Sequence, residues 1–333
     1  MTAFSRQAWI RPGRPPYLLL LCGLGTGAAI AASGARRGAG AGSAPLPSGA
    51  SQTADPSALR ATGVPWVVLP TFNEAENLER IVAAVLSTLE QAAPDGFRVL
   101  IVDDDSPDGT GAIADSLAAG HPGIEVLHRS EREGLGPAYI AGFRRALAQG
   151  AGHVLEMDAD GSHDPRDLAR LLTAVRGGSA DLALGSRYAT GGKISNWSIL
   201  RRATSRAGCW YARKVLRLDV GDLTGGFKCF AAEVLEAIDL ASVRSCGYAF
   251  QVELTYRALC AGYRVHEVPI TFHDREHGCS KMNWRIAVEA AWLVPQLRRD
   301  ADAAHRTRAS GRRMRPARVD FLPRSSEEPL PRS

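Results

Sequence analysis

The chain has 333 residues, of which 45% are hydrophobic and 23% are charged. This composition is that of an ordinary globular protein, and it excludes a wholly disordered chain, a collagen-like chain and a protein with many membrane spans. Six Cys lie far apart, without CxxC or Cys/His ligand spacing. Their spacing argues against a disulfide scaffold and favours a reducing compartment.

The formal net charge of +5 is unevenly distributed. Residues 1–63 contain six Arg against one acid, and residues 298–333 contain ten Arg against five acids, so each of these tails carries +5. Residues 64–297 therefore carry −5. A basic chain can indicate nucleic-acid binding, but here the body is acidic, and we expect no nucleic-acid partner.

The first 63 residues do not resemble a folded domain. Residues 34–63 are mainly Gly, Ala, Ser and Pro, which cannot form a hydrophobic core. The apolar run 17–33 follows Arg11 and Arg14 and has three interpretations: a cleaved signal, a weak membrane anchor, or an extension without a role, which we favour. The sequence predicts a disordered extension at 1–63, one domain at 64–297 and a basic disordered tail at 298–333.

From Pro65 onward, predicted strands and helices alternate. Short apolar runs predict strands at 66–69, 97–102, 124–128, 153–157 and 181–184, and apolar residues at helical spacing predict helices at 74–89, 110–119, 137–148 and 165–176. Unbroken apolar strands that alternate with helices indicate an α/β protein with a mostly parallel sheet covered on both faces. The second half is less regular, with helices expected at 199–216, 232–239, 248–261 and 284–297 and a strand at 265–272.

Acidic residues follow three of the predicted strands. Glu74 lies shortly after the first, Asp103-Asp-Asp105 ends the second, and Asp158-Ala-Asp160 follows the fourth. In an open α/β sheet, ligands bind outside the carboxyl ends of the strands. Like charges that meet there need a cation, and Mg²⁺ commonly uses one or two carboxylates together with substrate phosphates. The sequence therefore predicts a divalent cation and a phosphorylated ligand at this edge.

Each of these acidic motifs also has a simpler explanation. A DxD motif arises by chance in a chain of this length, and Asp is common in turns. The three consecutive acids can belong to a βα turn with a helix cap, and Glu74 suits the first turn of a helix. The position of Asp158 and Asp160 after a buried strand, among other acids at strand ends, favours the metal site.

Taken together, the motifs carry a family resemblance. They occur in one order over residues 64–283, as Pro70-Thr-Phe-Asn-Glu74, Val102-Asp-Asp-Asp-Ser-Pro-Asp-Gly-Thr110, Gly134-Leu-Gly-Pro-Ala-Tyr-Ile140, Met157-Asp-Ala-Asp-Gly-Ser-His163, Gly185-Ser-Arg-Tyr188, Asp222-Leu-Thr-Gly-Gly-Phe227, Glu267-Val-Pro-Ile270 and Gly278-Cys-Ser-Lys281. This set resembles the polyprenol-phosphate (dolichol-phosphate) mannosyltransferases, which are family 2 glycosyltransferases with a GT-A fold.

The resemblance implies a role for each matching residue. The nucleoside of GDP-mannose would be held by Pro70, Phe72, Glu74, Val102 and Asp104, with Phe72 at a position that is more often Tyr. Asp158, Ala159 and Asp160 would form the centre that binds Mg²⁺ or Mn²⁺ and the diphosphate, and Ser162 replaces a Gln metal ligand of some members. Phosphates of the donor or acceptor would be bound by Arg187, Arg201, Ser205, Arg275 and Lys281, with Gln251 lining the donor site. Asp160, Arg187 and Arg275 are the expected catalytic residues.

The resemblance implies an inverting transfer of mannose from GDP-mannose to a polyprenyl phosphate. A transferase of the same fold that uses UDP-glucose or UDP-GlcNAc is one alternative, and a non-catalytic nucleotide or nucleic-acid binder is another. Because the acceptor is a lipid, we expect peripheral association with the cytoplasmic face of a membrane. The expected helix at 284–297 can lie at the membrane interface or pack on the domain, and a separate membrane-anchored partner can assist.

Overall fold

The computed structural model describes most of the chain from Gly63 to Ala309 and a short segment near the C-terminus. The described residues are 63–243, 245, 247–274, 284–309 and 319–321. The predicted N-terminal extension, apart from Gly63, lies outside them. Arg275 and Lys281, two of the expected phosphate ligands, also lie outside the described residues.

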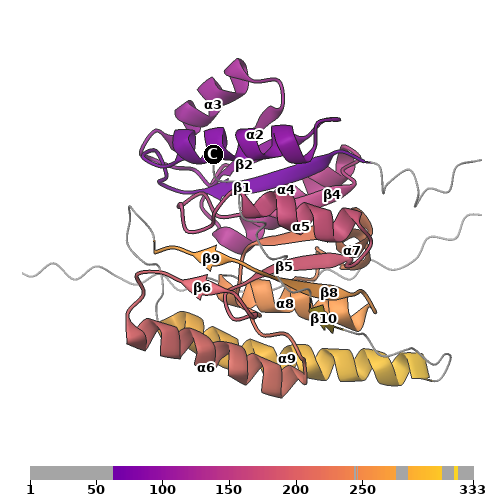
Figure 1. The fold of residues 1–333 in the computed structure, drawn as a ribbon. Coiled ribbons are helices and arrows are strands. Elements are labelled where there is room, and N and C mark those ends of the chain that lie inside the picture. Colours follow the sequence, from indigo (N-terminus) through magenta and orange to yellow (C-terminus); the bar gives the residue numbers. More distant parts are fainter. Residues whose placement is uncertain (1–62, 244, 246, 275–283, 310–318, 322–333) are drawn as a thin grey trace, which may run out of the picture. The chain divides into compact units, whose positions relative to one another are not determined.

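The centre of the domain is an eight-stranded sheet with the order β10-β8-β5-β7-β4-β1-β2-β3 (Figure 1). Its strands are parallel except for β7, which runs antiparallel to both β4 and β5. The strands are β1 Pro65–Thr71, β2 Arg98–Asp103, β3 Ile124–His128, β4 His153–Glu156, β5 Leu182–Ser186, β7 Lys228–Ala231, β8 Val265–Pro269 and β10 Val319–Phe321, and a separate parallel pair is formed by β6 Lys193–Ile194 and β9 Thr271–Phe272.

Helices cover both faces of this sheet. They are α2 Leu78–Ala92, α3 Thr110–Gly120, α4 Leu135–Ala148, α5 Asp167–Arg176, α6 Ile199–Leu216, α7 Ala232–Ala237, α8 Tyr248–Cys260 and α9 Trp284–Ala309. Buried side chains of α2, α3 and α5 pack in one core cluster, and those of α4, α6, α7, α8 and α9 pack in the other.

Strand β1 shows why the sheet needs cover on both faces. Val67 and Leu69 belong to one core cluster, whereas Trp66 and Val68 belong to the other, and all four are almost completely buried. Successive strand residues point to opposite faces, so an unbroken apolar run fills two cores at once. This arrangement holds the carboxyl ends of β1, β2 and β4 side by side, as the sequence predicted.

Several elements differ from the sequence-based expectations. Strands β6, β7 and β10 were not predicted, and β10 lies within the segment expected to be a disordered tail. The strand expected at 265–272 is divided at Ile270 into β8 and β9. Helix α9 continues to Ala309, beyond Leu297 where we expected the domain to end. Val294 and Leu297 of α9 are buried in the core cluster, and Arg298 donates to the carbonyl of Leu216 at 3.2 Å. Packing thus carries the helix into the segment expected to be a tail.

None of the described helices is both long and apolar enough to span a membrane.

Candidate active site

The candidate active site is a cavity of about 290 Å³ at the carboxyl ends of β1, β2 and β4. It collects most of the residues that the sequence assigned to donor binding, from segments more than a hundred residues apart. The lining residues are Pro70, Thr71, Phe72, Glu74, Asp104, Arg132, Gly134, Leu135, Ala138, Asp158, Ala159, Asp160, Thr224, Gly226, Gly247 and Gln251. Four of them are acidic and one, Arg132, is basic.

Asp158 and Asp160 are both held in place by the surrounding structure. Oδ1 of Asp158 accepts a hydrogen bond of 3.0 Å from the hydroxyl of Tyr139 on α4. Burial and the nearby charge of Asp158 raise the pKa of Tyr139 well above its usual value, so this hydroxyl remains a donor. Oδ1 of Asp160 accepts from the backbone N–H of Ser162 at 3.0 Å. The two carboxylates are therefore oriented in advance.

Ser162 supports the interpretation of this loop as a cation site. Its side-chain oxygen is buried and has no hydrogen-bond partner among the described residues. Buried polar groups without a partner are uncommon and suggest an unseen ion or water. Within the described residues, no group of three or more His, Cys, Asp or Glu side chains could hold a metal ion. Two carboxylates and one hydroxyl leave the remaining positions of a Mg²⁺ or Mn²⁺ ion to phosphate oxygens and water.

Phe72 and Asp104 lie at the end of the cavity formed by β1 and β2. The guanidinium of Arg132 lies over the Phe72 ring, 3.8 Å from its centroid. The buried carboxylate of Asp104 accepts hydrogen bonds from Arg129 and, at 2.8 Å, from the backbone N–H of Gly134. Asp104 thus anchors the loop that carries Arg132, in addition to lining the cavity.

Gln251 lines the cavity from the first turn of α8, and its side chain is hydrogen-bonded to one member of a buried charge pair. Its side-chain oxygen accepts a hydrogen bond from Lys228, whose Nζ lies 2.9 Å from Oε1 of Glu156. Burial lowers the pKa of Lys228 and raises that of Glu156, against their mutual attraction. Val102, by contrast, is buried in the core within β2 and does not line the cavity.

A second, smaller cavity of about 40 Å³ adjoins the first and shares Asp158 and Asp160 with it. Arg201 reaches this cavity from the first turn of α6. Its guanidinium lies over the Trp197 ring, 4.2 Å from the centroid, and Nη1 contacts Oδ1 of Asp274 at 2.6 Å. Nε of Arg201 is buried without a hydrogen-bond partner among the described residues.

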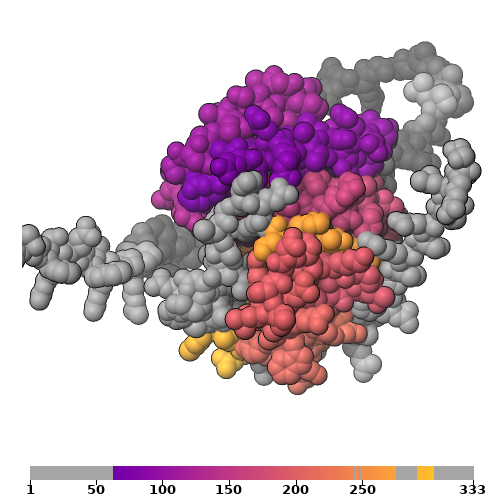
Figure 2. Space-filling view, turned by 60° about the vertical axis from the view of Figure 1, so that its left-hand side comes forward, coloured from indigo at the N-terminus to yellow at the C-terminus, as the bar shows by residue number. Residues whose placement is uncertain are grey.

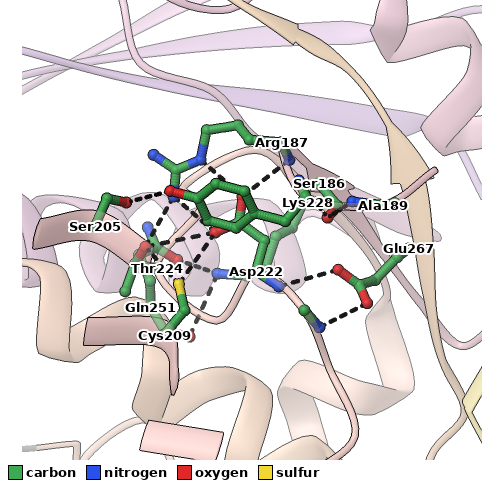
Figure 3. A network of polar contacts seen from close by, with 12 residues as sticks. Ser186, Arg187, Ala189, Ser205, Cys209, Asp222, Thr224, Lys228, Gln251 and Glu267 are labelled. Atoms are coloured by element: carbon green, nitrogen blue, oxygen red, sulfur yellow. Dashed lines mark hydrogen bonds and ion pairs between the residues drawn. The ribbon is translucent and has the colours of Figure 1, made fainter. Parts of the chain in front are cut away.

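Arg187 also lines the second cavity, but much of its hydrogen-bonding capacity is already used (Figure 3). Its Nε and Nη2 donate to the two carboxylate oxygens of Asp222 at 2.7 and 2.6 Å, and Nη2 also donates to Thr224 at 2.8 Å. Burial disfavours the Asp222 anion, but the charge and hydrogen bonds of Arg187 outweigh this effect and lower its pKa. The same attraction raises the pKa of Arg187 against the effect of burial. This geometry leaves Nη1 as the part of Arg187 that can meet a ligand.

Ser205 lies outside both cavities. It sits half-buried on α6, where its hydroxyl accepts a hydrogen bond of 2.7 Å from Tyr188. Of the expected ligand residues that the structure describes, Val102 and Ser205 are the two that line neither cavity.

Sequence reasoning did not assign roles to Tyr139, Arg132 or Asp222. Tyr139 and Asp222 lie within quoted motifs, so their motif position was the available signal. Arg132 is one of many Arg in the chain, and nothing in the local sequence distinguishes it.

Comparisons with known proteins show the family to which the chain belongs. Residues 66–239 match the family model described as glycosyl transferase family 2. The chain is 47% identical over 243 residues to a polyprenol monophosphomannose synthase of Mycolicibacterium smegmatis, covering 73% of this chain and 89% of that protein. It is 50% identical over 223 residues to an undecaprenyl-phosphate mannosyltransferase of Micrococcus luteus, covering 67% of this chain and 89% of that protein.

Solved structures share the fold at lower identity. Glucosyl-3-phosphoglycerate synthase from Mycobacterium tuberculosis, in complex with phosphoglyceric acid, superposes with a TM-score of 0.51 at 19% identity, covering 74% of this chain and 83% of that chain. The same enzyme with Mn²⁺, UDP-glucose and phosphoglyceric acid gives a TM-score of 0.50 at 20% identity, with the same coverage. The predicted GT-A fold is thereby confirmed. The chain belongs to glycosyl transferase family 2, and it is a glycosyltransferase with curated mannosyltransferases among its relatives.

Proposed function

We propose that the protein transfers mannose from GDP-mannose to a polyprenyl phosphate, with inversion at the anomeric carbon. The observation that carries this proposal is the joining of two cavities at Asp158 and Asp160, one acidic and one approached by Arg201. The names of the two curated relatives support the lipid phosphate acceptor and the mannosyl group. The donor nucleotide comes from the family resemblance.

The larger cavity suits the donor. Pro70, Phe72 and Glu74 would contact the nucleoside, while Asp104 shapes the wall beside it. The diphosphate would lie at Asp158 and Asp160, where an acidic lining repels it unless a cation intervenes. A Mg²⁺ or Mn²⁺ ion held by these carboxylates and Ser162 would neutralise the charge that develops on the departing diphosphate.

The smaller cavity suits the acceptor phosphate. Nε of Arg201 can donate to a phosphate oxygen, and its stacking on Trp197 fixes the plane of the guanidinium. An acceptor phosphate is already anionic at neutral pH, so the attacking oxygen needs no strong general base. We infer that catalysis depends mainly on positioning and electrostatic stabilisation, with Nη1 of Arg187 as a further donor. Arg275 and Lys281 remain proposed phosphate ligands.

The lipid acceptor requires access to a membrane. We propose peripheral association with the cytoplasmic face, where nucleotide sugars are available, either directly or through a separate membrane-anchored partner. Association through the expected helix at 284–297 is less favoured, because Val294 and Leu297 of α9 are buried against the domain.

Donor choice can be tested by thermal unfolding with Mn²⁺ or Mg²⁺ present. We expect GDP-mannose to raise the melting temperature more than UDP-glucose, UDP-GlcNAc or RNA, because ligands that bind only the folded state stabilise it. A preference for a UDP-sugar would replace the proposed donor. Stabilisation by RNA alone would favour the nucleic-acid binder.

Transfer itself can be followed with radiolabelled mannose and a polyprenyl phosphate acceptor. We expect label in the lipid extract with the wild-type protein and none with Asp160→Ala. Asp105→Asn is a matched control, because Asp105 is an exposed acid on the same edge of the sheet and Asn tolerates its positive φ of 59°. Full activity of Asp160→Ala would refute the assignment of this carboxylate.

A further inference from the structure

Helix α6 is strongly basic, although it belongs to an acidic domain. The 18 residues Ile199–Leu216 include five Arg or Lys and no Asp or Glu, and Arg217 follows as the C-cap. Residues 64–297 as a whole carry −5. Helix α6 is therefore a purely basic element within a body whose net charge is negative.

The same helix exposes large apolar side chains. Its inner side packs into the core through Cys209, Ala212 and Leu216. Ile199, Leu200 and Trp210 are 88%, 77% and 62% exposed, and they are three of the five large hydrophobic residues exposed in the described part of the chain. Ile199 and Trp210 are eleven residues apart, or about three helical turns, so they point to the same side.

A fourth exposed apolar residue lies on the neighbouring helix. Trp292 of α9 is 73% exposed. Helices α6 and α9 lie side by side (Figure 1), and the Tyr211 hydroxyl donates to the carbonyl of Ala291 at 2.9 Å. Trp210 directly precedes Tyr211 and Trp292 directly follows Ala291, so each Trp is the sequence neighbour of a residue that joins the two helices.

The C-terminal end of α6 adds a basic hollow to this surface. Trp210, Arg213, Lys214, Arg217 and Leu218 line a cavity of about 460 Å³. Arg213 pairs with Asp219 at 2.9 Å, whereas Lys214 and Arg217 have no carboxylate partner among the residues that the structure describes.

Basic residues in the last turn of a helix are favoured by its dipole. The dipole therefore accounts for Arg213 and Lys214 without any ligand. It accounts neither for Arg202 and Arg206, which lie earlier in the helix, nor for the exposed Trp210. Lone exposed apolar residues are ordinary, but Trp beside Lys and Arg on the outer side of a helix is typical of a helix that lies in a membrane interface.

We propose that the outer face of α6, formed by Ile199, Leu200, Trp210, Arg213, Lys214 and Arg217, docks onto a lipid bilayer that carries anionic headgroups. Figure 2 shows α6, in red, at the surface of the molecule. The apolar side chains enter the headgroup region, and the basic hollow receives headgroup phosphates. This inference rests on the proposed function, because a lipid acceptor must reach the active site from a membrane.

The position of α6 beside the active site links membrane docking to binding of the lipid acceptor. Arg201, in the first turn of α6, lines the second cavity beside Asp158 and Asp160. Ile199 and Leu200 directly precede it in the chain. A lipid held at the N-terminal end of the docked helix would therefore present its phosphate to Arg201 without leaving the bilayer surface.

The full chain can be tested by flotation with vesicles of phosphatidylcholine alone or mixed with phosphatidylglycerol. We expect flotation with both kinds of vesicle, and stronger flotation with the anionic ones. The triple variant Arg213→Gln, Lys214→Gln, Arg217→Gln should weaken partitioning about a hundredfold, since each basic residue near an anionic surface contributes about fivefold. Trp210→Glu should weaken it with both kinds of vesicle.

A control with the same charge change keeps this test specific. It replaces three exposed Arg of α4 and α5, as Arg144→Gln, Arg145→Gln, Arg176→Gln. The two triple variants should have similar melting temperatures, and only the α6 variant should lose flotation. Equal flotation of the two would overturn the proposal. So would a wild-type dimer that Trp210→Glu converts to a monomer without any effect on flotation.

Transfer to a short-chain, water-soluble acceptor phosphate separates this inference from the proposed function. The α6 triple variant should transfer mannose to that acceptor at the wild-type rate, but more slowly to a long-chain acceptor embedded in anionic vesicles. Absence of transfer by the wild-type protein with either acceptor would refute the proposed function, whereas flotation would still report on α6.

Discussion

We expect the negative charge of the buried Asp222 side chain to be necessary for the stability of the folded domain. Its Oδ2 accepts from the backbone N–H and from Nε of Arg187 at 2.9 and 2.7 Å, and its Oδ1 accepts from Nη2 at 2.6 Å. In Asp222→Asn, an amide NH₂ replaces one of these oxygens. A donor then faces a donor, and Arg187 keeps its charge although it is only 6% exposed.

The expected loss is large, because removing one partner of a buried ion pair costs about 3–5 kcal/mol. In a domain of about 150–250 residues, each kcal/mol lowers the melting temperature by about 2–4 °C, so Asp222→Asn should melt about 6–20 °C lower. Asp181→Asn is a matched control, because the Asp181–Arg264 pair has similar geometry but its side chains are 18% and 48% exposed. An exposed pair contributes about 0–1 kcal/mol, and the control should change little.

The pH dependence provides an independent check. The pKa of Asp222 is lower in the folded protein than its ordinary value of 3.8, so the stabilisation is complete above that value and is lost as the pH falls through the folded-state pKa. The difference in melting temperature between wild type and Asp222→Asn should therefore be constant near neutral pH and shrink in strong acid. Circular dichroism melts across this range measure it. If Asp222→Asn melts within 2 °C of Asp181→Asn at pH 7, on the order of the exposed-pair cost, the argument from burial is wrong.

Three further variants test other parts of the structure. Burial, reinforced by Arg176, lowers the pKa of His153 from 6.5 to about 4. Between these two pH values the unfolded chain binds more protons than the folded chain, so the free energy of unfolding should fall by up to about 3 kcal/mol as the pH is lowered. Urea unfolding should show a smaller fall for His153→Gln. Gly142→Ala places a Cβ 2.4 Å from Cγ1 of Val68, and overpacking of about 1–3 kcal/mol should lower the melting temperature despite better helix propensity. Arg201→Lys loses the planar fork and should raise KM for the lipid phosphate about tenfold while KM for GDP-mannose is unchanged in steady-state kinetics.

The regular elements of the first half were predictable because their packing is periodic. Strand β3 has the predicted bounds, Ile124–His128, and in the second half helix α6 also has the predicted bounds, Ile199–Leu216. Strand β7 was missed because Lys228 interrupts its apolar run. That lysine is buried only because Glu156, which is opposite it on β4, supplies the partner. A contact across 72 residues leaves no local signal in the sequence.

The candidate site was predictable to the extent that it depends on topology. The carboxyl ends of parallel strands lie at one edge of the sheet, and from this rule we predicted that Glu74, Asp104 and Asp158 lie close together. All three line the same cavity. The detailed partners were not predictable, since each joins separate loops. Arg187 was expected to bind phosphate, yet two of its nitrogens are held by Asp222.

Under the proposed function, the different charges lining the two cavities would direct the two phosphorylated substrates to different places. Among the described residues, the larger cavity is lined by four acidic side chains and one basic side chain, Arg132, so we expect a diphosphate to bind there together with a divalent cation. The smaller cavity adds Arg187 and Arg201 to the same two carboxylates, Asp158 and Asp160. A single phosphate can bind to these guanidinium groups directly. In the proposed reaction, the anionic acceptor would therefore approach the donor from the side where Arg187 and Arg201 fix positive charge in the protein, and Arg201 lies in the first turn of α6.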